Sequence, residues 1–507
     1  MNSARNVSLL LHAHLPYGLR TEVPFSLEEA WLHEATIDCY VPLLYVFGSL
    51  PAGKLPPIAV SLSPTLIEMW EHPAFPERFE AHLRRGINLF ENEAADPTLP
   101  APRRALASNY AQSWESILKD FRSKFQGKLL GAWTQLAQLG KVELLTTATT
   151  HAFLPAHQNA TSRKLQIELG VERFTRLTGI EPKGFWLPEC AYYLGLERDL
   201  ETIGIEWFSV ENMGESSLTR CPNKLLAISR HSYLSRKVWD ARSGYPGNVD
   251  YREFHRDAIK ELSHEKAGLF RLENGDSLPL GMKYWRVSGQ EDKDWYDPAQ
   301  AVEQARQDAH DFIRELEEEA TDPITFLPFD AELFGHWWFE GPVWIKEILH
   351  LASSAQSLHL GTPTEILADA PEIHVGRPKP STWGHQSDYS FWVNHETDWI
   401  YPLLQQADRQ LAELLNNQPK QESTLYGRAI GQLTRELLLA QASDWPFMIR
   451  AGATANYARE RIQRHLARFH YLAEQIAQGN IDQEALAGLE ELDPILPDLT
   501  IERLIHS

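Results

Sequence analysis

The sequence predicts an α/β protein in which a parallel βα barrel is followed by an all-helical carboxyl-terminal domain. Short apolar segments recur along roughly the first 375 residues, and each one ends in a polar motif and precedes a helical pattern. From about residue 376 onward, Leu and Ala recur at helical spacing instead. We therefore divide the chain into a barrel at 1–375, with an inserted subdomain or lid at 230–280, and a helical domain at 376–507.

Composition and charge describe an ordinary globular protein with more than one domain. Hydrophobic residues make up 43% of the 507 residues and charged residues 23%. The 69 acidic and 48 basic residues leave a net charge of −21, which argues against nucleic acid and anionic membranes as partners. The sixteen tryptophans and sixteen tyrosines favour a carbohydrate ligand, because aromatic faces stack on sugar rings.

Cysteine usage and the amino terminus predict a cytoplasmic protein. Cys39, Cys190 and Cys221 offer neither a disulfide framework nor a zinc-binding spacing, which fits a reducing compartment. The apolar run near the amino terminus is too short for a signal peptide and is broken by His12. A stretch long enough to span a membrane is not found. We expect a monomer or a small homo-oligomer.

The elements are expected in alternating order along the barrel. Strands are predicted at 7–11, 58–61, 142–145, 184–187, 207–210 and 324–327. Helices are predicted at 27–47, 105–139, 162–179, 194–203 and 298–320, and in the second domain at 403–417, 425–442 and about 453–478. The alternation fails between 230 and 280, where GYPG at 244–247 signals a turn, and we interpret this segment as the insert. SDWPF at 443–447 is expected to interrupt the last two helices.

Three histidines follow predicted strands. Extended backbone puts His12 and His14 on the same side of the chain, directly after the first strand. That pair suits a metal site of the amidohydrolase kind and suits equally well two hydrogen-bond donors aimed at a substrate. His151 follows the third strand, so it is expected at the same rim of the barrel.

Two acids, Glu189 and Asp330, each follow a strand and a proline, about 140 residues apart. Cleavage of a glycosidic bond needs such a pair, because one carboxylate attacks the anomeric carbon while a carboxylic acid protonates the leaving oxygen. Their environments must therefore differ, so that one is ionised and the other protonated. A structural interpretation is that Asp330 caps a helix starting near residue 331 and that the neighbouring Trp337 and Trp338 belong to the core.

Five segments in order resemble the motifs of glycoside hydrolase family 57. They read HAHLPY, TTHAFLP, GFWLPECAY, PFDAELFGHWWFEGP and the block that begins TWG at 382. GYPGNVDYREFHRD, GMKYWRVSG and the SDWPF region further resemble the 1,4-α-glucan branching enzymes of that family. The similarity runs from about residue 7 to 470.

The resemblance implies a distorted (β/α)7 barrel with an inserted subdomain and a helical carboxyl-terminal domain. It also implies a retaining mechanism without metal or cofactor, in which Glu189 is the nucleophile and Asp330 the general acid/base. The residues that match substrate-binding positions of the family are His12, His14, His151, Trp285, Trp383, Trp392 and Asp444. Cys190, beside the nucleophile, is expected only to pack.

The expected reaction is glucan branching, in which an α-1,4 bond is cleaved and the chain is transferred to a 6-hydroxyl. An α-amylase-like hydrolase of the same family is the nearest alternative, since it would use the same two acids. A metal-dependent amidohydrolase and a catalytically inactive glucan-binding protein are further alternatives. The sequence departs from the family at His385-Gln386-Ser387 and in a short lid segment at 229–244, where Tyr233 is expected at the tip. Both departures concern the acceptor side.

Overall fold

The computed structural model describes residues 4–23, 26–51, 58–211, 217–268, 270–271, 277–288, 293–320, 322, 324–368, 373–417 and 424–505. Parts of the predicted insert, at 269 and 272–276, lie outside the described residues. So does Gly289, the last residue of the GMKYWRVSG segment.

A single curled sheet forms the centre of the molecule. Its strands are β1 (Arg5–Ala13), β2 (Ile58–Leu62), β3 (Val142–Thr147), β4 (Gly184–Trp186), β5 (Trp207–Val210), β6 (Leu218–Arg220), β7 (Leu226–Ser229), β8 (Thr325–Asp330) and β9 (Leu358–Leu360). The order is β6-β7-β5-β4-β3-β2-β1-β8, with β9 added beside β1, and only the β6–β7 pair is antiparallel among these strands.

The sheet closes into a distorted (β/α)7 barrel, as predicted. The parallel path β7-β5-β4-β3-β2-β1-β8 returns on itself through a bridge between Arg230 and Phe326. At that seam the backbone N–H of His231 donates to the carbonyl of Phe326 at 2.9 Å. The strands are buried along nearly their whole length, which is why they read as short continuous apolar runs. Strand β7 was not predicted.

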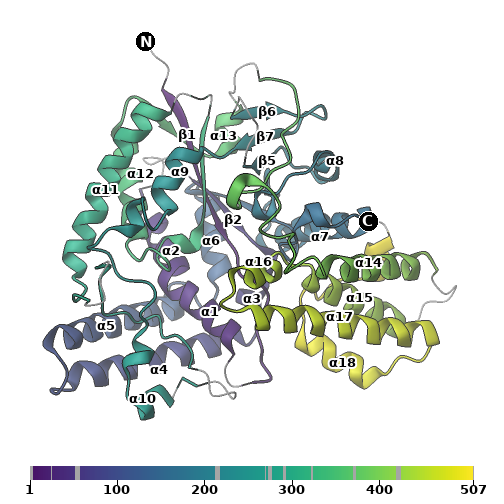
Figure 1. The fold of residues 1–507 in the computed structure, drawn as a ribbon, viewed down its shortest axis with the longest axis horizontal. Helices are drawn as coiled ribbons and strands as arrows, with labels where there is room; N and C mark the ends of the chain where they lie inside the picture. The colour runs from purple at the N-terminus through teal and green to yellow at the C-terminus, as the bar shows by residue number, and fades with distance from the viewer. Residues whose placement is uncertain are drawn as a thin grey trace.

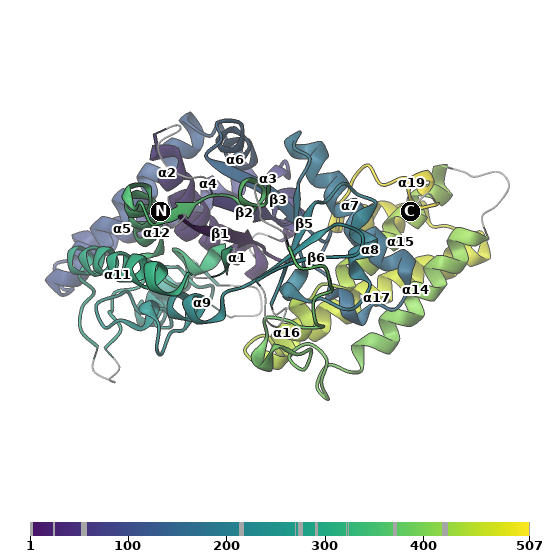
Figure 2. The ribbon, with the colours of Figure 1, turned by 90° about the horizontal axis from the view of Figure 1, so that it is seen from above.

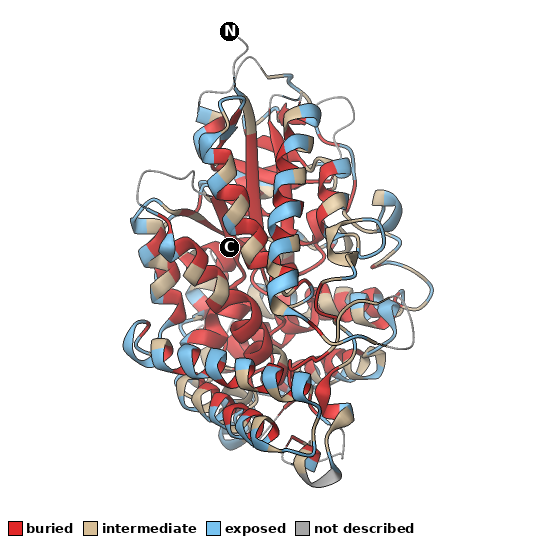
Figure 3. Cartoon of the chain, turned by 90° about the vertical axis from the view of Figure 1, so that its left-hand side faces the viewer, coloured by how far each residue is buried: buried red, intermediate tan, exposed pale blue. Residues whose placement is uncertain are grey.

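Helices cover the barrel; those at 64–71, 75–95, 341–354 and 363–368 were not predicted, and the others overlap predicted helices. The helices are α1 (Leu27–Ala35), α2 (Val41–Ser49), α3 (Pro64–Glu71), α4 (Phe75–Ala95), α5 (Ala101–Ser123), α6 (Leu129–Gln138), α7 (Ala160–Thr178), α8 (Leu196–Glu201), α11 (Pro298–Glu319), α12 (Gly341–Ser354) and α13 (Pro363–Ala368). The helical region predicted at 105–139 consists of two helices, α5 and α6, and Gln126 and Gly127 between them take positive φ angles of 52° and 73°. Figure 3 shows the exposed residues of the outer helices on one face and the buried residues on the other.

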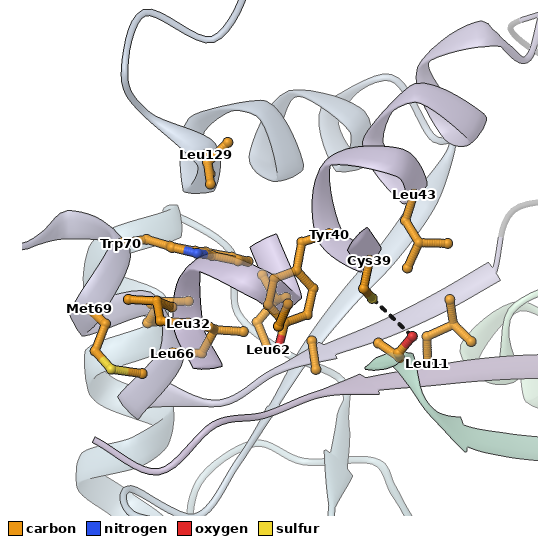
Figure 4. Close-up of a cluster of buried hydrophobic side chains, with 14 of the residues drawn as sticks. Leu11, Leu32, Cys39, Tyr40, Leu43, Leu62, Leu66, Met69, Trp70 and Leu129 are labelled. Carbon is orange, nitrogen blue, oxygen red and sulfur yellow. Dashed lines mark hydrogen bonds between the residues drawn. The ribbon is translucent and has the colours of Figure 1, made fainter. Parts of the chain in front are cut away.

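A π-helical turn, η1 (Thr36–Tyr40), joins α1 to α2 within the predicted helix at 27–47. It brings Tyr40 and Cys39 down onto the sheet, where the Cys39 thiol donates to the carbonyl of Ala331 at 3.0 Å (Figure 4). Gly335 packs directly against the turn, with a φ of 117°, and a Cβ there would lie 1.8 Å from the Asp38 carbonyl oxygen. The segment that follows β8 therefore packs directly on this turn.

The insert comprises α9 (Ser232–Trp239), η4 (Tyr245–Gly247), η5 (Ala258–Glu261) and α10 (His264–Gly268), with extended segments between them. Two buried cations attach it to the barrel. Arg252 pairs with Asp38 at 3.3 Å and lies 3.7 Å above the ring of Phe339. Lys283 pairs with Glu34 at 3.4 Å.

Helices make up the carboxyl-terminal region. They are α14 (Ile400–Asn416), α15 (Thr424–Ala440), α16 (Asp444–Ala451), α17 (Ala455–Gln478), α18 (Gln483–Leu492) and α19 (Ile501–Ile505). Figures 1 and 2 both show α14, α15 and α17 beside α7 and on the opposite side of the molecule from α11 and α12. The SDWPF segment was expected only as an interruption, but Asp444 in fact begins a helix of its own.

Arg461 of α17 ties the helical region to the barrel. Its buried guanidinium donates to the Tyr17 carbonyl at 2.9 Å and pairs with Glu28 of α1 at 3.3 Å. Among the described helices none combines the length and apolar character needed to cross a bilayer.

Candidate active site

The predicted histidines and acids converge at the carboxyl ends of the parallel strands. His12 lies near the end of β1 and is the register partner of Asp330, the last residue of β8. His151 follows β3, and Glu189 follows β4 in the turn Pro188–Cys190. His151 and Glu189 both have positive φ angles, 56° and 62°, which L-residues rarely adopt. Such backbone strain is typical of functional sites.

The three imidazoles form a stack. The ring centroids of His14 and His151 are 4.0 Å apart, and those of His12 and His151 are 4.9 Å apart. The indole of Trp186 covers His12 with a centroid distance of 4.8 Å. The Nε2 atoms of His12 and His151 are hydrogen-bonded at 3.0 Å, and burial holds the pKa of both rings well below its usual range. Both rings are therefore neutral.

Glu189 accepts hydrogen bonds from two directions. The indole N–H of Trp383 donates to Oε2 at 2.8 Å, and the hydroxyl of Ser443 donates to Oε1 at 2.7 Å. Burial raises the pKa of Glu189 to about 7, against the opposing effect of these two donors and of His14. The Trp383 backbone N–H also donates to the Glu189 carbonyl at 3.0 Å, so the same residue fixes both the main chain and the carboxyl group.

Asp330 is surrounded by acids. Burial, Glu332, Glu189 and Asp444 all raise the pKa of its carboxyl group well above the ordinary value, and only Arg230 opposes them appreciably. Asp330 makes no capping hydrogen bond to the short helix Ala331–Leu333, so the structural interpretation of this residue as a helix cap is wrong. The carboxyl group of Glu189 is close enough to interact with that of Asp330 through charge.

A cavity of about 360 Å³ opens beside Asp330. Predicted residues on its wall are Trp383 and Trp392. Exposed aromatic side chains on three separate segments also line it: Trp239 at the end of α9, Trp337 after β8 and Phe447 on α16 are 48%, 46% and 45% exposed. A cavity with flat apolar rings on its walls and the polar side chains of Asp330 and Arg230 beside them suits a sugar chain, which has apolar ring faces and hydroxyl groups.

The remaining predicted residues take different places. Asp444 lies beside His14, with 3.1 Å between Oδ2 and Nε2. Trp392 is buried and stacks on Phe153 at 5.2 Å, with part of its surface on the cavity. Trp285 is not among the residues lining this cavity; it stacks on Trp295 at 4.3 Å and donates to Glu261 of the insert at 2.7 Å.

Two further expectations concern neighbours of the site. Cys190 is fully buried in a hydrophobic cluster with Trp186, which agrees with a packing role. Tyr233 does not reach the cavity as the tip of a lid, because its hydroxyl donates to Glu315 of α11 at 3.1 Å. The segment instead presents Trp239 to the cavity.

Several residues of the site were missed by the sequence reasoning. Ser443 was read as part of an interruption between helices, and Arg230 as the start of the insert. Trp239 and Phe447 carried no spacing signal. Glu332 accepts from Tyr40 and from the backbone N–H of His14, and it shares the motif of Asp330, which was the one available clue.

A metal-binding geometry is partly present. The ligand atoms of His14, His151 and Asp444 lie within 4.8 Å of one another. His12 has both ring nitrogens engaged, by Ser61 at 3.1 Å and by His151 at 3.0 Å, and His151 likewise has both engaged, by His12 and by Ser443 at 2.8 Å. His12 therefore has no free ring nitrogen for the metal site that the amidohydrolase alternative builds on His12 and His14.

Comparison with known families matches residues 8–375 to glycosyl hydrolase family 57 and residues 403–503 to the carboxyl-terminal domain of 1,4-alpha-glucan branching enzymes. The barrel and its family match define an enzyme of the glycoside hydrolase and glycosyltransferase class. The chain belongs to glycosyl hydrolase family 57.

Individual relatives align along nearly the whole chain. A 1,4-alpha-glucan branching enzyme of Thermococcus kodakarensis is 30% identical over 96% of this chain and 76% of its own length. Among solved structures, the alpha-amylase AmyC from Thermotoga maritima is 32% identical with a TM-score of 0.90, covering 99% of both chains. The family 57 branching enzyme from Pyrococcus horikoshii is 28% identical with a TM-score of 0.87, covering 99% of this chain and 97% of its own.

Proposed function

We propose that this protein is a 1,4-α-glucan branching enzyme that acts by a retaining mechanism. The observation that carries the proposal is the contribution of the helical region to the site. The segment that matches the carboxyl-terminal domain of branching enzymes supplies Ser443, bonded to Glu189, and Asp444, bonded to His14. The region shared with branching enzymes is thus part of the site itself.

The two carboxyl groups are assigned by their surroundings. Glu189 is the nucleophile, because its two hydrogen-bond donors stabilise the carboxylate form. Asp330 is the general acid, because its acidic neighbours and its burial favour the protonated form. Acid–base and nucleophilic work on a glycosidic bond requires two carboxyl groups with different environments, and those of Glu189 and Asp330 are close enough to interact through charge.

The reaction proceeds in two displacements. Asp330 gives its proton to the α-1,4 glycosidic oxygen as a carboxylate oxygen of Glu189 attacks C1, so the bond to the leaving chain breaks and a glycosyl ester forms. The Asp330 carboxylate then takes the proton of an acceptor 6-hydroxyl. The acceptor oxygen attacks C1, the ester bond breaks, and Glu189 returns to its carboxylate form with an α-1,6 branch made.

The histidines bind the sugar in the donor site. His12 and His151 are neutral, so they add no charge to the site, and their ring nitrogens are hydrogen-bonded to Ser61, to each other and to Ser443. Burial lowers the pKa of His14, but Asp444 beside it outweighs this effect and raises the pKa overall. Of the three rings, His14 is thus the one whose protonated form is favoured by its neighbours.

Water competes with the acceptor hydroxyl for the ester, so transfer depends on aromatic side chains that hold an acceptor chain over the cavity. Hydrolysis by the same residues is the second candidate, favoured by the similarity to a structure described as an alpha-amylase. An amylose or glycogen-like polysaccharide in the cytoplasm is the proposed substrate. The acidic charge of the chain supports action without nucleic acid or membrane partners.

Linkage analysis of the product tests the function. Amylose is incubated with the protein, and the product is then treated with a debranching enzyme. Branching predicts short chains released by debranching, with few new reducing ends before that treatment. New reducing ends without releasable chains would establish hydrolysis instead.

We expect full activity after removal of divalent metal. His14 and Asp444 are bonded to each other, and both acids can act without a Lewis acid. The check is the branching rate after dialysis against a chelator, with elemental analysis of the dialysed protein. A loss of activity that added metal restores would assign the His14, His151 and Asp444 group as a metal site.

A further inference from the structure

A continuous chain of hydrogen bonds runs from the barrel interior to the Glu189 carboxylate. Its links are Ser61 Oγ to His12 Nδ1 at 3.1 Å, His12 Nε2 to His151 Nε2 at 3.0 Å, His151 Nδ1 to Ser443 Oγ at 2.8 Å, and Ser443 Oγ to Glu189 Oε1 at 2.7 Å. Ser61, His12, His151 and Ser443 are all at least nine-tenths buried. Each link therefore has few competing partners.

The direction of every proton in this chain follows from the charge at its end. An ionised Glu189 only accepts, so the Ser443 hydroxyl gives its hydrogen to Glu189 and its oxygen must accept from His151 Nδ1–H. A neutral His151 then has a bare Nε2, which accepts from His12 Nε2–H. The remaining nitrogen of His12 accepts from the Ser61 hydroxyl.

Protonation of Glu189 allows the whole chain to reverse. Glu189 would then donate to Ser443, Ser443 to His151 Nδ1, and each imidazole would switch tautomer without gaining or losing charge. The tautomers of two histidines at the proposed sugar site are thereby coupled to the state of the carboxyl group. Ser443 is the link between them, and it comes from the helical region and not from the barrel.

We propose that Ser443 is a positioning residue for the family's reaction, which holds the Glu189 carboxylate in place and sets the tautomers of His151 and His12. The proposal rests on the proposed function, because it takes Glu189 as the nucleophile. Other titratable groups that act on Glu189 are His14, His151, Asp330 and Asp444, and none of them replaces the hydroxyl donor.

The test is the pH profile of kcat/KM for an activated donor, α-maltosyl fluoride, measured with wild type, Ser443→Ala and Ser443→Thr. Loss of the donor destabilises the carboxylate, so Ser443→Ala is expected to move the acid limb upward by about one pH unit and thereby to lower kcat/KM at pH 7 by about fivefold. Ser443→Thr keeps a hydroxyl and is expected to restore the wild-type limb. Ser61→Ala, at the far end of the chain, is expected to give a smaller shift in the same direction.

The outcomes separate the inference from the proposed function. The fluoride donor reports formation of the ester whether water or glucan accepts it, so the result does not depend on branching. An inactive Glu189→Gln variant together with an unshifted acid limb in Ser443→Ala overturns the role of Ser443 alone. Activity retained in Glu189→Gln overturns the assignment of the nucleophile. A Tm loss in Ser443→Ala without rescue by Ser443→Thr would make Ser443 merely structural.

Discussion

At the scale of single residues, the site distinguishes two carboxyl groups by what surrounds them. Glu189 has an indole and a hydroxyl donating to it, whereas Asp330 faces acids. Among the residues that the structure describes, none donates a hydrogen bond to the Asp330 side chain. The difference predicts separate roles that separate experiments can isolate.

Asp330→Asn should block proton transfer but leave the nucleophile intact. With amylose we expect a loss of about a thousandfold in rate, because the leaving oxygen needs a proton. With α-maltosyl fluoride the leaving group needs none, so the ester should form and accumulate for want of a base. Mass spectrometry of the intact protein checks this by the added mass of a maltosyl group.

Glu189→Gln is the matched control for that measurement. It removes the attacking oxygen, so it should show no adduct with the same fluoride. An adduct on Glu189→Gln, or none on Asp330→Asn, would contradict the assignment of the two roles.

The pKa shifts predict a bell-shaped dependence of kcat/KM on pH. Glu189 must be ionised, and burial raises its pKa to about 7, so activity should fall as the pH drops through 7. Asp330 must be protonated, and burial together with its acidic neighbours raises its pKa well above the usual value, so activity should fall again when the pH rises far enough to ionise it. An acid limb with its midpoint below pH 5 would contradict this account. The two midpoints belong to the interacting pair.

Residue chemistry was the part of the site most open to prediction from sequence. Glu189, Asp330 and the histidines stand after strand ends, and parallel strands bring their carboxyl ends together. The contact of Ser443 with Glu189 could not be predicted from the sequence, because the two residues are 254 positions apart and no local pattern connects them. The positive φ angles of His151 and Glu189 also leave no trace in composition.

At the scale of elements, periodicity located the buried strands well and irregular elements poorly. Continuous apolar runs gave β1, β2, β3, β5 and β8 within a few residues. The π-helical turn at η1 packs against Gly335, a contact 295 or more positions away in the chain that local propensity does not encode. Helix α9 shows the same limit, because its sequence did not tell which aromatic side chain would face the cavity.

Trp239 and Tyr233 on α9 offer a matched pair for testing the acceptor surface. Trp239 lines the cavity, whereas Tyr233 is bonded to Glu315 on α11, and their exposures are similar at 48% and 49%. Trp239→Ala should remove a stacking surface for the acceptor and lower the ratio of transfer to hydrolysis by about two- to tenfold. Tyr233→Ala should leave that ratio unchanged.

The measurement is the count of new branches against new reducing ends during the same digestion of amylose. Equal effects of the two substitutions would mean that α9 acts through its stability. A change with Tyr233→Ala alone would restore the predicted lid.

At the scale of the whole molecule, a barrel followed by a helical region could be predicted from the sequence, but the contacts between the two could not. Helical spacing predicts that α17 exists and which of its faces is apolar. It does not say that Arg461 reaches a carbonyl at Tyr17, 444 positions away. Such contacts depend on how the helical region packs against the barrel, which no local sequence pattern records.

Arg461 should be a major source of stability at this junction. It is buried, pairs with the buried Glu28, and its guanidinium lies 5.1 Å above the ring of Trp445, beside Asp444 and Ser443. Arg461→Gln would leave Glu28 buried without its cation, so we expect a loss of about 3–5 kcal/mol in the free energy of unfolding. Thermal denaturation, monitored by circular dichroism, checks this.

Arg464→Gln on the same helix is the control. Arg464 is only partly buried, with its side chain 41% exposed, and it is weakly paired with Glu460 at 3.9 Å, so its loss should change stability by less than about 0.5 kcal/mol. Because α16 packs on α17, the partly loosened junction in Arg461→Gln should also weaken the Ser443 contact, and the acid limb of kcat/KM should rise as it does in Ser443→Ala. A destabilised Arg461→Gln with an unchanged pH profile would show that the helical region holds its site residues independently of this anchor.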